Sequence, residues 1–488
     1  MKVVTMIAIS PILDKRNSQP VYMQLYKYIR AQIEAGSLAE GVQLPAIRQL
    51  ALHLGISKNT VEAAYQQLLS EGYVDSKERG GYRILPLEEL IWPLKTNKSE
   101  TESEPIENTA DEPLLPRKVD YDFQYGDMEI GRFPHEVWKS CLVEAVSSRS
   151  SEVLGYGHYQ GDAELRAEIA RYAFESRGVH CHPNQIIVCA GTQHSVSMLC
   201  QLMSLREQRI GMEEPGYAGV KNVLRNHGCS LTPIPLEQDG IQIERLYTAG
   251  VQVAYVTPSH QFPVGMVLPI HKRTRLLQWA IDCDGLILED DYDSEFRYYG
   301  QPVPALKALD TADKVIYMGT FSKSFLPSAR LSYLVLPPTL MATVQDKLAN
   351  YSQPVSPIIQ KAVMLFMNRG HFARHIRKMR RIYQGKHKAV TTAIQRWMGE
   401  YVEVIGDRSG LHLLLHVKGR QSEELLQLGE LAGCRVYSPS RHWNHAPDCP
   451  GGYIMLGFGG MEEAQLTEGI RLLSEAWFGG KNYLERKI

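Results

Sequence analysis

The stretch Met318-Gly319-Thr320-Phe321-Ser322-Lys323-Ser324 follows an apolar run and decides how the rest of the chain is interpreted. A lysine at the end of a strand, among small hydroxyl residues, is suited to Schiff-base chemistry with an aldehyde cofactor. Thr320, Ser322 and Arg330 offer hydroxyl and guanidinium donors for a phosphate. Because a lysine in a loop is more often a solvated charge, the assignment of Lys323 depends on its companions.

A second motif, Leu286-Ile287-Leu288-Glu289-Asp290-Asp291-Tyr292, is an apolar run that ends in acidic residues. Successive side chains of a strand point to opposite faces, so Asp290 and Tyr292 are predicted on one face, and Glu289 and Asp291 on the other. A buried carboxylate can pair with a pyridinium nitrogen, and a phenol can bond a ring hydroxyl. Without the lysine motif, a solvated or calcium-like acidic loop is the better interpretation.

Two further segments could complete such a site. Ala190-Gly191-Thr192-Gln193 links a predicted strand to a predicted helix, where the N–H groups of Gly191, Thr192 and Gln193 can cradle a phosphate. In Glu214-Pro215-Gly216-Tyr217, Tyr217 can lie flat on a cofactor ring. Each segment is weak by itself, because Gly-Thr turns are common and an aromatic in this setting is as often a core residue.

The region 117–488 alternates short apolar runs with helical stretches. Four of these runs are rich in β-formers, and each is followed by a polar loop: Ile186–Cys189, Val253–Val256, Leu286–Leu288 and Val315–Met318. The alternation predicts an α/β fold with a largely parallel sheet covered by helices. In such sheets ligands bind at the carboxyl ends of the strands, which is where the motifs lie.

Residues 17–85 are predicted to form a separate unit of three helices and a hairpin. Apolar residues at helical spacing follow Pro20, a second helix is expected from about Ala46 to Leu54, and Ser57 is suited to cap a third. The Gly-Gly pair at Gly80 predicts the turn between two short strands. Spacing alone leaves two functions open, DNA binding and a small scaffold for protein contacts.

Between these regions, residues 86–116 are predicted to be a flexible linker, because the sequence there is polar and acidic. The formal net charge of the chain is −1, but residues 1–85 hold ten Lys/Arg against seven Asp/Glu. The chain shows no signal-peptide cleavage pattern, no apolar stretch of about 20 residues and no C-x-x-C pair. We therefore expect a cytoplasmic location, no membrane span and no metal.

The third predicted helix would expose Lys58, Asn59 and Thr60 at its first turn, where they can reach phosphates or base edges. Lys77 and Arg79 lie near the predicted wing turn. The runs 44–51, 56–61 and 68–74 of this head closely resemble the GntR-family winged helix-turn-helix. The resemblance implies that Arg48, Lys58, Asn59, Thr60 and the wing around Gly80 contact double-stranded DNA at an operator.

Residues 120–475 resemble fold-type I aminotransferases, and especially the aminotransferase-like domain of MocR/GabR regulators. The strongest pieces are Thr257–Pro263, Glu289–Phe296 and the Lys323 segment. The resemblance implies a pyridoxal 5′-phosphate (PLP) cofactor, a large domain and a small C-terminal α/β domain from about residue 370. It implies Lys323 as the imine lysine, Asp290 at the ring nitrogen, Tyr292 at the ring hydroxyl and Tyr217 stacked on the ring. It places Gly191, Thr192, Gln193, Thr320 and Arg330 at the phosphate.

The run Tyr156–Gly161 resembles the segment that reaches into the partner's site in aminotransferase dimers, which implies a domain-swapped homodimer. Two departures bear on catalysis. Aminotransferases place an asparagine where Phe262 stands, and an arginine for the substrate carboxylate in the late run 452–460, which has none here.

Three functions remain from the sequence. The expected one is a PLP-dependent transcription regulator that senses a small effector: an amine, an amino acid, a small peptide or a B6 vitamer. The second is an active aminotransferase that carries a DNA-binding head, and the third is a DNA-binding protein with an inactive cofactor fold. The two departures argue against efficient transamination, and the intact cofactor motifs argue against the third.

Overall fold

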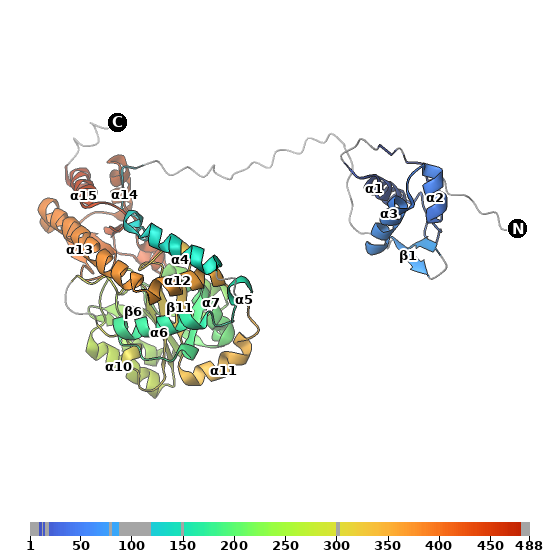
Figure 1. Ribbon diagram of the computed structural model, residues 1–488. Coiled ribbons are helices and arrows are strands. Elements are labelled where there is room, and N and C mark those ends of the chain that lie inside the picture. The colour runs from blue at the N-terminus through green and yellow to red at the C-terminus, as the bar shows by residue number, and fades with distance from the viewer. Residues whose placement is uncertain are drawn as a thin grey trace. The chain divides into compact units, whose positions relative to one another are not determined.

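The computed structural model of the chain describes residues 9–11, 13–14, 19–77, 81–86, 119–147, 151–298 and 303–479. The chain divides into two units, Met1–Pro113 and Leu114–Ile488. In Figure 1 the first is a small unit of helices with a hairpin, and the second is a larger unit of helices and sheets. The predicted fold class, a winged helix-turn-helix with an aminotransferase-like α/β domain, is confirmed.

The small unit has the predicted three helices and hairpin. Gly55 ends the second helix in a left-handed conformation, with φ of 62°. Ser57 caps the third helix by accepting a hydrogen bond from the backbone N–H of Thr60. The elements are α1 (Val21–Glu34), α2 (Ile47–Leu54), α3 (Lys58–Ser70), β1 (Val74–Lys77) and β2 (Gly81–Ile84). The core between them includes Leu25, Ile29, Val61 and Leu68.

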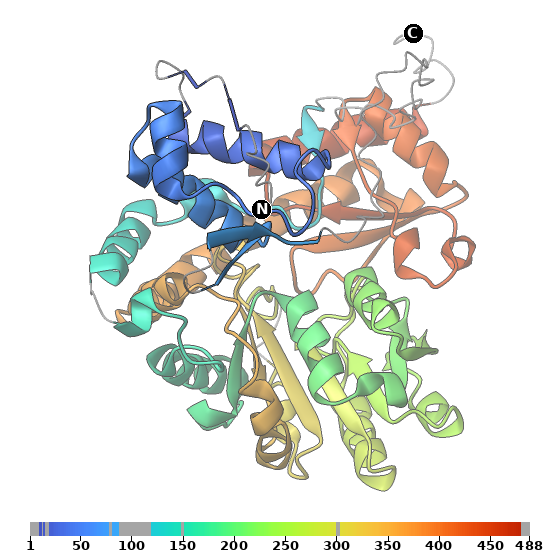
Figure 2. The ribbon, with the colours of Figure 1, turned by 90° about the vertical axis from the view of Figure 1, so that its right-hand side faces the viewer.

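An eight-stranded sheet forms the centre of the large unit (Figure 2). Its order is β4-β11-β10-β9-β8-β5-β6-β7, and the run from β10 to β6 is parallel. The strands are β4 (Ile186–Cys189), β5 (Arg209–Glu214), β6 (Ser230–Glu237), β7 (Gly240–Ile241), β8 (Val253–Val256), β9 (Leu286–Asp291), β10 (Val315–Thr320) and β11 (Ser332–Val335). The largely parallel sheet is confirmed, although the sequence did not reveal that β11 runs antiparallel to both neighbours.

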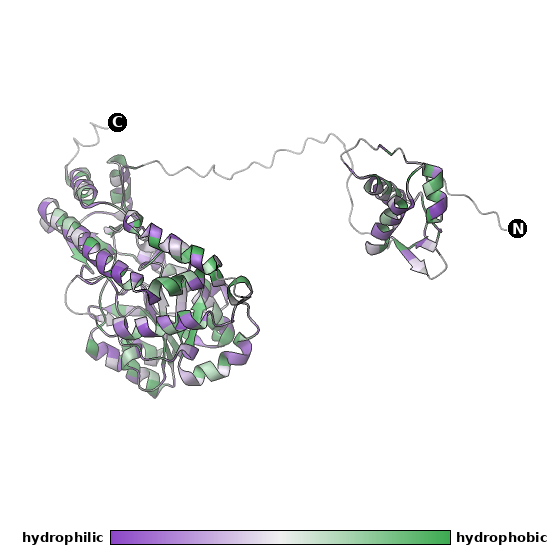
Figure 3. Ribbon diagram, in the orientation of Figure 1, coloured by the Kyte–Doolittle hydropathy of each residue, from purple (hydrophilic) through white to green (hydrophobic). Residues whose placement is uncertain are grey.

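Helices cover both faces of this sheet. One face packs against α7 (Thr192–Leu202), α8 (Ala218–Asn226) and α11 (Pro338–Leu348). The other packs against α4 (His135–Ser147), α6 (Ala163–Arg177), α9 (Ile243–Thr248), α10 (Ile270–Asp282) and α12 (Pro357–Asn368). Along these helices hydrophilic and hydrophobic residues alternate, as expected for helices that bury one side (Figure 3).

A second, antiparallel sheet consists of β12 (Val402–Ile405), β13 (His412–Val417) and β15 (Tyr453–Gly457). It packs against the long helix α13 (His371–Trp397) and against α14 (Ser422–Leu431) and α15 (Glu463–Phe478). A short parallel pair joins β3 (Tyr121–Asp122) to β14 (Cys434–Arg435). The short helix α5 (Ser151–Leu154) completes the unit. The expected boundary of a small subdomain near residue 370 stays a prediction.

A buried ion pair ties helix α6 to strand β9. The Nε atom of Arg177 donates to Oδ2 of Asp291 at 2.6 Å, and both side chains are at least 96% buried. The hydroxyl of Tyr317 donates to the same carboxylate oxygen at 2.6 Å. The remaining guanidinium nitrogens donate to Ser259 and to the carbonyl of Val303. The charge of Asp291 is therefore compensated inside the core, on the sheet face opposite to Asp290.

We expect Arg177→Met to destabilise the large unit by about 3–5 kcal/mol, because it leaves Asp291 as an unpaired buried charge. Arg471→Met is the matched control, since Arg471 pairs with Glu468 at the surface and should contribute less than about 1 kcal/mol. Urea unfolding followed by tryptophan fluorescence measures both. Equal free energies of unfolding for the two variants would contradict an anchoring role for this pair.

Candidate cofactor site and DNA-binding helix

The predicted cofactor residues gather around one cavity of about 260 Å³ at the carboxyl ends of β9 and β10. Of the predicted set, only Gly191 does not line the cavity, and it lies beside the guanidinium group of Arg330, which does. The lining residues are Tyr125, Thr192, Gln193, Tyr217, Thr257, Phe262, Asp290, Tyr292, Thr320, Ser322, Lys323, Pro327 and Arg330. Segments that lie more than 100 residues apart in the chain thus meet where the sheet topology predicts a ligand site.

Lys323 extends into this cavity from the loop after β10. Its ammonium lies 4.4 Å from the ring centre of Tyr125, and within the described ranges it has no hydrogen bond or ion pair. Burial lowers the pKa of Lys323 below its usual range, while Asp293 and Asp127 partly oppose the change. Gly126 leaves the necessary space, since a Cβ there would lie 3.2 Å from the lysine Nζ. Burial therefore favours the neutral, nucleophilic form of this amine.

Asp290 is a buried carboxylate that faces the cavity from the end of β9. The hydroxyl of Tyr255 donates to its Oδ2 at 2.5 Å, and no cation pairs with it among the described residues. Burial raises the pKa of Asp290 to about 7, although the Tyr255 hydrogen bond lowers it. A protonated ring nitrogen beside Asp290 would supply the missing positive partner, which fits the predicted role.

The opposite end of the cavity can hold an anion. Helix α7 begins at Thr192, and its N-cap residue Gly191 has no side chain that could accept from the first turn, so the N–H groups of Thr192 and Gln193 remain available. The N–H of Gly191, which was expected to join this cradle, instead donates to Oγ of Ser332 at 3.0 Å. Gly191 has φ of +96°, and a Cβ there would lie 2.5 Å from a terminal nitrogen of Arg330. Thr320 donates to Ser322 at 3.1 Å, which places both hydroxyls beside the same region. A phosphate would find N–H, hydroxyl and guanidinium donors here.

The two departures from the aminotransferase pattern meet in one apolar cluster. Phe262 is 2% exposed and packs with Leu414 and Met455, a residue of β15 within the late run that lacks an arginine. The rings of Tyr217 and Phe262 are perpendicular, with centres 5.5 Å apart. At both departures the chain therefore carries a side chain, Phe262 or Met455, that offers no hydrogen-bond donor to a carboxylate.

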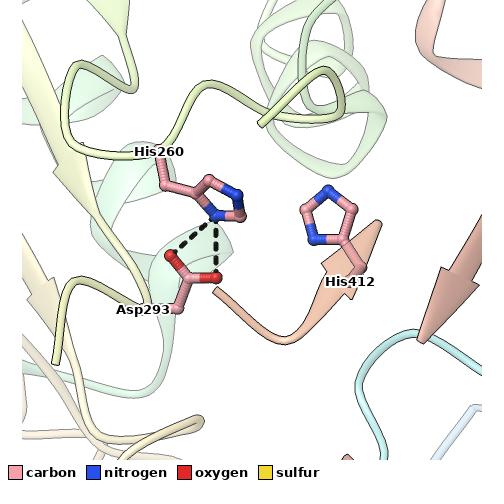
Figure 4. Close-up of side chains that lie close together, drawn as sticks. All are labelled: His260, Asp293 and His412. Carbon is pink, nitrogen blue, oxygen red and sulfur yellow. Dashed lines mark hydrogen bonds and ion pairs between the residues drawn. The ribbon is translucent and has the colours of Figure 1, made fainter. Parts of the chain in front are cut away.

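Tyr292 contacts a buried pair that the sequence did not reveal. Its hydroxyl lies 2.9 Å from Nδ1 of His260, and that nitrogen lies 3.0 Å from both carboxylate oxygens of Asp293. His412 comes toward the pair from β13 (Figure 4). One donor atom from each of His260, Asp293 and His412 lies within 4.8 Å of the others, the only such potential metal group among the described residues. The absence of a metal stays a prediction.

Other site residues were missed because their motifs are ordinary. Tyr255 belongs to a short apolar strand, where its hydroxyl gave no separate signal, and Tyr125 lies outside every motif. His260 and Asp293 stand inside the two segments that carried the resemblance, at Thr257–Pro263 and Glu289–Phe296. Their pairing depends on the distance between loops that follow different strands, which the sequence alone does not give.

In the small unit, the predicted DNA contacts lie on α2 and α3. Arg48, Lys58 and Asn59 are exposed, whereas Thr60 is half-buried and its hydroxyl is hydrogen-bonded to Ser57 at 2.8 Å. Lys77 ends β1, with its side chain outside the described part. Arg79 and Gly80 lie outside the described residues. Lys58 and Asn59 thus form a polar, exposed first turn of α3, the part of a recognition helix that meets DNA in this motif, and Arg48 lies on α2.

Comparison with known proteins places both units. Residues 21–84 match the family described as bacterial regulatory proteins, gntR family, and residues 125–440 match aminotransferase class I and II. The chain is 39% identical to the uncharacterized HTH-type transcriptional regulator YdeL of Bacillus subtilis (strain 168), over 96% of this chain and 99% of that protein. It is 33% identical to the probable rhizopine catabolism regulatory protein MocR of Rhizobium meliloti, over 96% and 95%.

Among solved structures, the chain is similar to kynurenine aminotransferase of Pyrococcus horikoshii in complex with PMP, with a TM-score of 0.67 and 24% identity over 74% of this chain and 90% of that one. At this identity the likeness shows the fold alone. Within the described residues, no helix is long and apolar enough to cross a membrane. The family models and the full-length relatives together show that the chain belongs to the HTH-type transcriptional regulators that join a GntR-family head to an aminotransferase class I and II domain.

Proposed function

We propose that this protein is a transcription regulator that binds operator DNA through its head and a small effector through PLP held in its large unit. The observation that carries the proposal is the lysine of the cavity, Lys323, which is largely buried, contacts the ring of Tyr125 and has no hydrogen bond or ion pair in the described part of the chain. A buried amine without a counter-ion is costly unless it reacts or pairs. When bound, PLP supplies an aldehyde for this amine and an electron-withdrawing ring.

The residues of the cavity fit this cofactor at both ends. Asp290 would accept a hydrogen bond from the ring nitrogen and keep it protonated, while the start of α7 and Arg330 would hold the phosphate. Lys323 lines the same cavity and would take the aldehyde. Tyr217 would contact the ring from one side.

The apolar cluster around Phe262 supports regulation rather than turnover. A bidentate guanidinium–carboxylate contact is among the strongest anchors for an amino acid, and β15 supplies none. We infer that effectors reach the lysine but that sustained transamination between an amino donor and a keto acid is weak. Repeated turnover of such a pair would support the alternative, an active aminotransferase with a DNA-binding head.

A homodimer is part of the proposal. Tyr156, in the run that resembles a partner-reaching segment, is 92% exposed in the single chain. Nearby apolar side chains of α4 and α5 are also exposed, with Val143 at 60% and Leu154 at 61%. Exposed apolar residues in one region are typical of a surface that pairs with another chain. A domain-swapped dimer would bury these side chains and hold two heads together. A cytoplasmic location of the protein is also part of the proposal.

The cofactor should attach to Lys323. Borohydride reduction of the loaded protein, followed by peptide mapping, is expected to place the adduct on this residue and to find none in Lys323→Ala. Lys307 and Lys314 are internal controls, because each is already paired with an aspartate, Lys307 with Asp310 and Lys314 with Asp284. An adduct mainly on either control lysine would contradict the assignment.

DNA binding should depend on the first turn of α3. We expect the combined change Arg48→Gln, Lys58→Gln and Thr60→Ala to weaken binding at least about tenfold, and to reduce the slope of log affinity against log salt by about one per lost phosphate contact. Lys27→Gln is the matched control, since Lys27 is exposed on α1. Fluorescence anisotropy with a labelled duplex at several salt concentrations measures both. Unchanged binding by the triple variant would refute the recognition-helix role.

The effector response should run through Lys323. Lys323→Ala is expected to leave the head folded and able to bind DNA, but to abolish the change in DNA affinity caused by amines, amino acids, small peptides or B6 vitamers. In the unaltered protein that change should be roughly 5–150-fold, which corresponds to a coupling of about 1–3 kcal/mol. Adding a few Gly/Ser residues to the predicted linker should reduce this effector response less than Lys323→Ala does, because the entropy of loop closure grows slowly with length. An undiminished response in Lys323→Ala would show that effector sensing does not need this lysine.

A further inference from the structure

A buried carboxylate–imidazole pair lies beside the cofactor cavity without lining it. His260 follows strand β8 and Asp293 follows strand β9, and the two side chains are 1% exposed. Nδ1 of His260 lies 3.0 Å from both carboxylate oxygens, as the dashed lines of Figure 4 show. The same nitrogen lies 2.9 Å from the hydroxyl oxygen of Tyr292, which does line the cavity. The three groups thus run from the core to the cavity wall.

With Asp293 as a carboxylate, the contacts allow one assignment of the protons. A carboxylate offers only lone pairs, so Nδ1 of His260 must carry a hydrogen that it donates to Asp293. A protonated Nδ1 cannot accept the hydroxyl hydrogen of Tyr292, which is therefore free to be donated elsewhere. Burial, followed by the nearby charge of Asp293, raises the pKa of Tyr292 well above its usual value, so the phenol stays a donor.

This arrangement matters because the neighbouring position has no polar group. Phe262 stands where the resemblance to aminotransferases predicted a second donor for the ring hydroxyl, and its ring packs at right angles to that of Tyr292, with centres 5.8 Å apart. Of the two expected donors, only the Tyr292 hydroxyl remains. The hydrogen bond to that ring oxygen therefore depends on the direction in which the Tyr292 hydroxyl points its hydrogen.

We propose that Asp293 and His260 are positioning residues that hold the Tyr292 hydroxyl as a donor toward the ring hydroxyl of the cofactor. The inference rests on the proposed function. Asp293 fixes the imidazole in its Nδ1–H form, and the imidazole prevents the phenol from turning its hydrogen inward. Neither residue touches the reacting atoms.

The second sheet holds the pair in place. Nε2 of His412, on β13, donates to the carbonyl of Pro263 at 3.0 Å, and burial lowers the pKa of His412 well below its usual value, so this ring is neutral. Gly410, with φ of +79°, lies so close that a Cβ would be 2.0 Å from Cε1 of His260 and 2.5 Å from Oδ2 of Asp293. The other ionisable groups facing Tyr292 are Tyr125, Tyr255 and Asp290.

The test is a double-mutant cycle on the visible band of the loaded, full-length protein, whose pH dependence reports the pKa of the nitrogen that links Lys323 to PLP. A donor at the ring oxygen withdraws negative charge from it and so weakens its hold on the linking proton. Tyr292→Phe should therefore raise this pKa, by about 0.5 to 1. Asp293→Asn and His260→Gln should each raise it in the same direction. In the Tyr292→Phe background His260→Gln should add nothing, and Asp293→Asn should no longer raise the pKa, because only the loss of its charge near Lys323 remains.

The sign separates this role from a simple charge effect. If Asp293 acted only as a distant anion, its removal would destabilise the protonated link and lower the pKa, so a fall with Tyr292 in place, or full additivity with Tyr292→Phe, would overturn the proposal. Glu295→Gln is the control, because this buried carboxyl group accepts from Tyr172 outside the pair and should leave the band unchanged. If the Asp293→Asn variant does not fold, His260→Gln combined with Tyr292→Phe tests the positioning role in the same way.

Two further outcomes are separable. Stoichiometric zinc or another transition metal in the purified protein, lost on substitution of His412, would make the cluster a metal site and overturn the positioning role. A protein that shows no visible band with PLP before any substitution would refute the proposed function itself. A band that is present but insensitive to Asp293→Asn and His260→Gln would refute only the positioning role.

Discussion

The buried pair of Arg177 and Asp291 is the interaction on which the rest of the large unit depends. It holds α6 against the centre of the sheet, and its guanidinium also bonds groups that follow β8 and precede β10. Two charges are removed from water here, and their compensation is concentrated on one carboxylate oxygen. Oδ2 of Asp291 accepts hydrogen bonds from Arg177 and Tyr317, whereas Oδ1 is buried without a hydrogen-bond partner among the described residues. Because strand residues alternate, fixing Asp291 on one face fixes Asp290 on the other. The ion pair therefore determines the direction of the carboxylate that faces the cavity.

The same alternation gives neighbouring residues of β9 different roles: Glu289 anchors a loop, and Asp290 faces the cavity. Glu289 accepts hydrogen bonds from the backbone N–H groups of Leu306 and Lys307, and it anchors that loop. Burial raises the pKa of Glu289 to about 7, as it does for Asp290, so a raised pKa alone does not identify the functional carboxylate. Asp290 differs because it faces the cavity and no cation pairs with it among the residues that the structure describes, whereas Glu289 is already bonded to backbone N–H groups.

Much of the molecule could be predicted from local patterns. Gly55 and Ser57 delimit helices for reasons of backbone geometry and capping, and the strands β4 and β8 coincide with their apolar runs. The lining residues could be predicted because strand ends meet at one edge of a parallel sheet. The antiparallel insertion of β11 and the His260–Asp293 contact could not, because both depend on which distant segments become neighbours. No periodicity or spacing within one segment carries that information.

The antiparallel course of β11 has a mechanical consequence. The chain leaves the sheet after Thr320 and returns at Ser332, opposite it in the register of the two strands. Lys323 and Arg330 therefore belong to one hairpin with both ends clamped at the same edge, while Asp290 belongs to the adjacent strand. A ligand held by all three residues would bridge this hairpin and the neighbouring strand β9. Because both ends of the hairpin are held in the sheet, we expect a movement of Lys323 to move Arg330 with it, relative to Asp290 on β9.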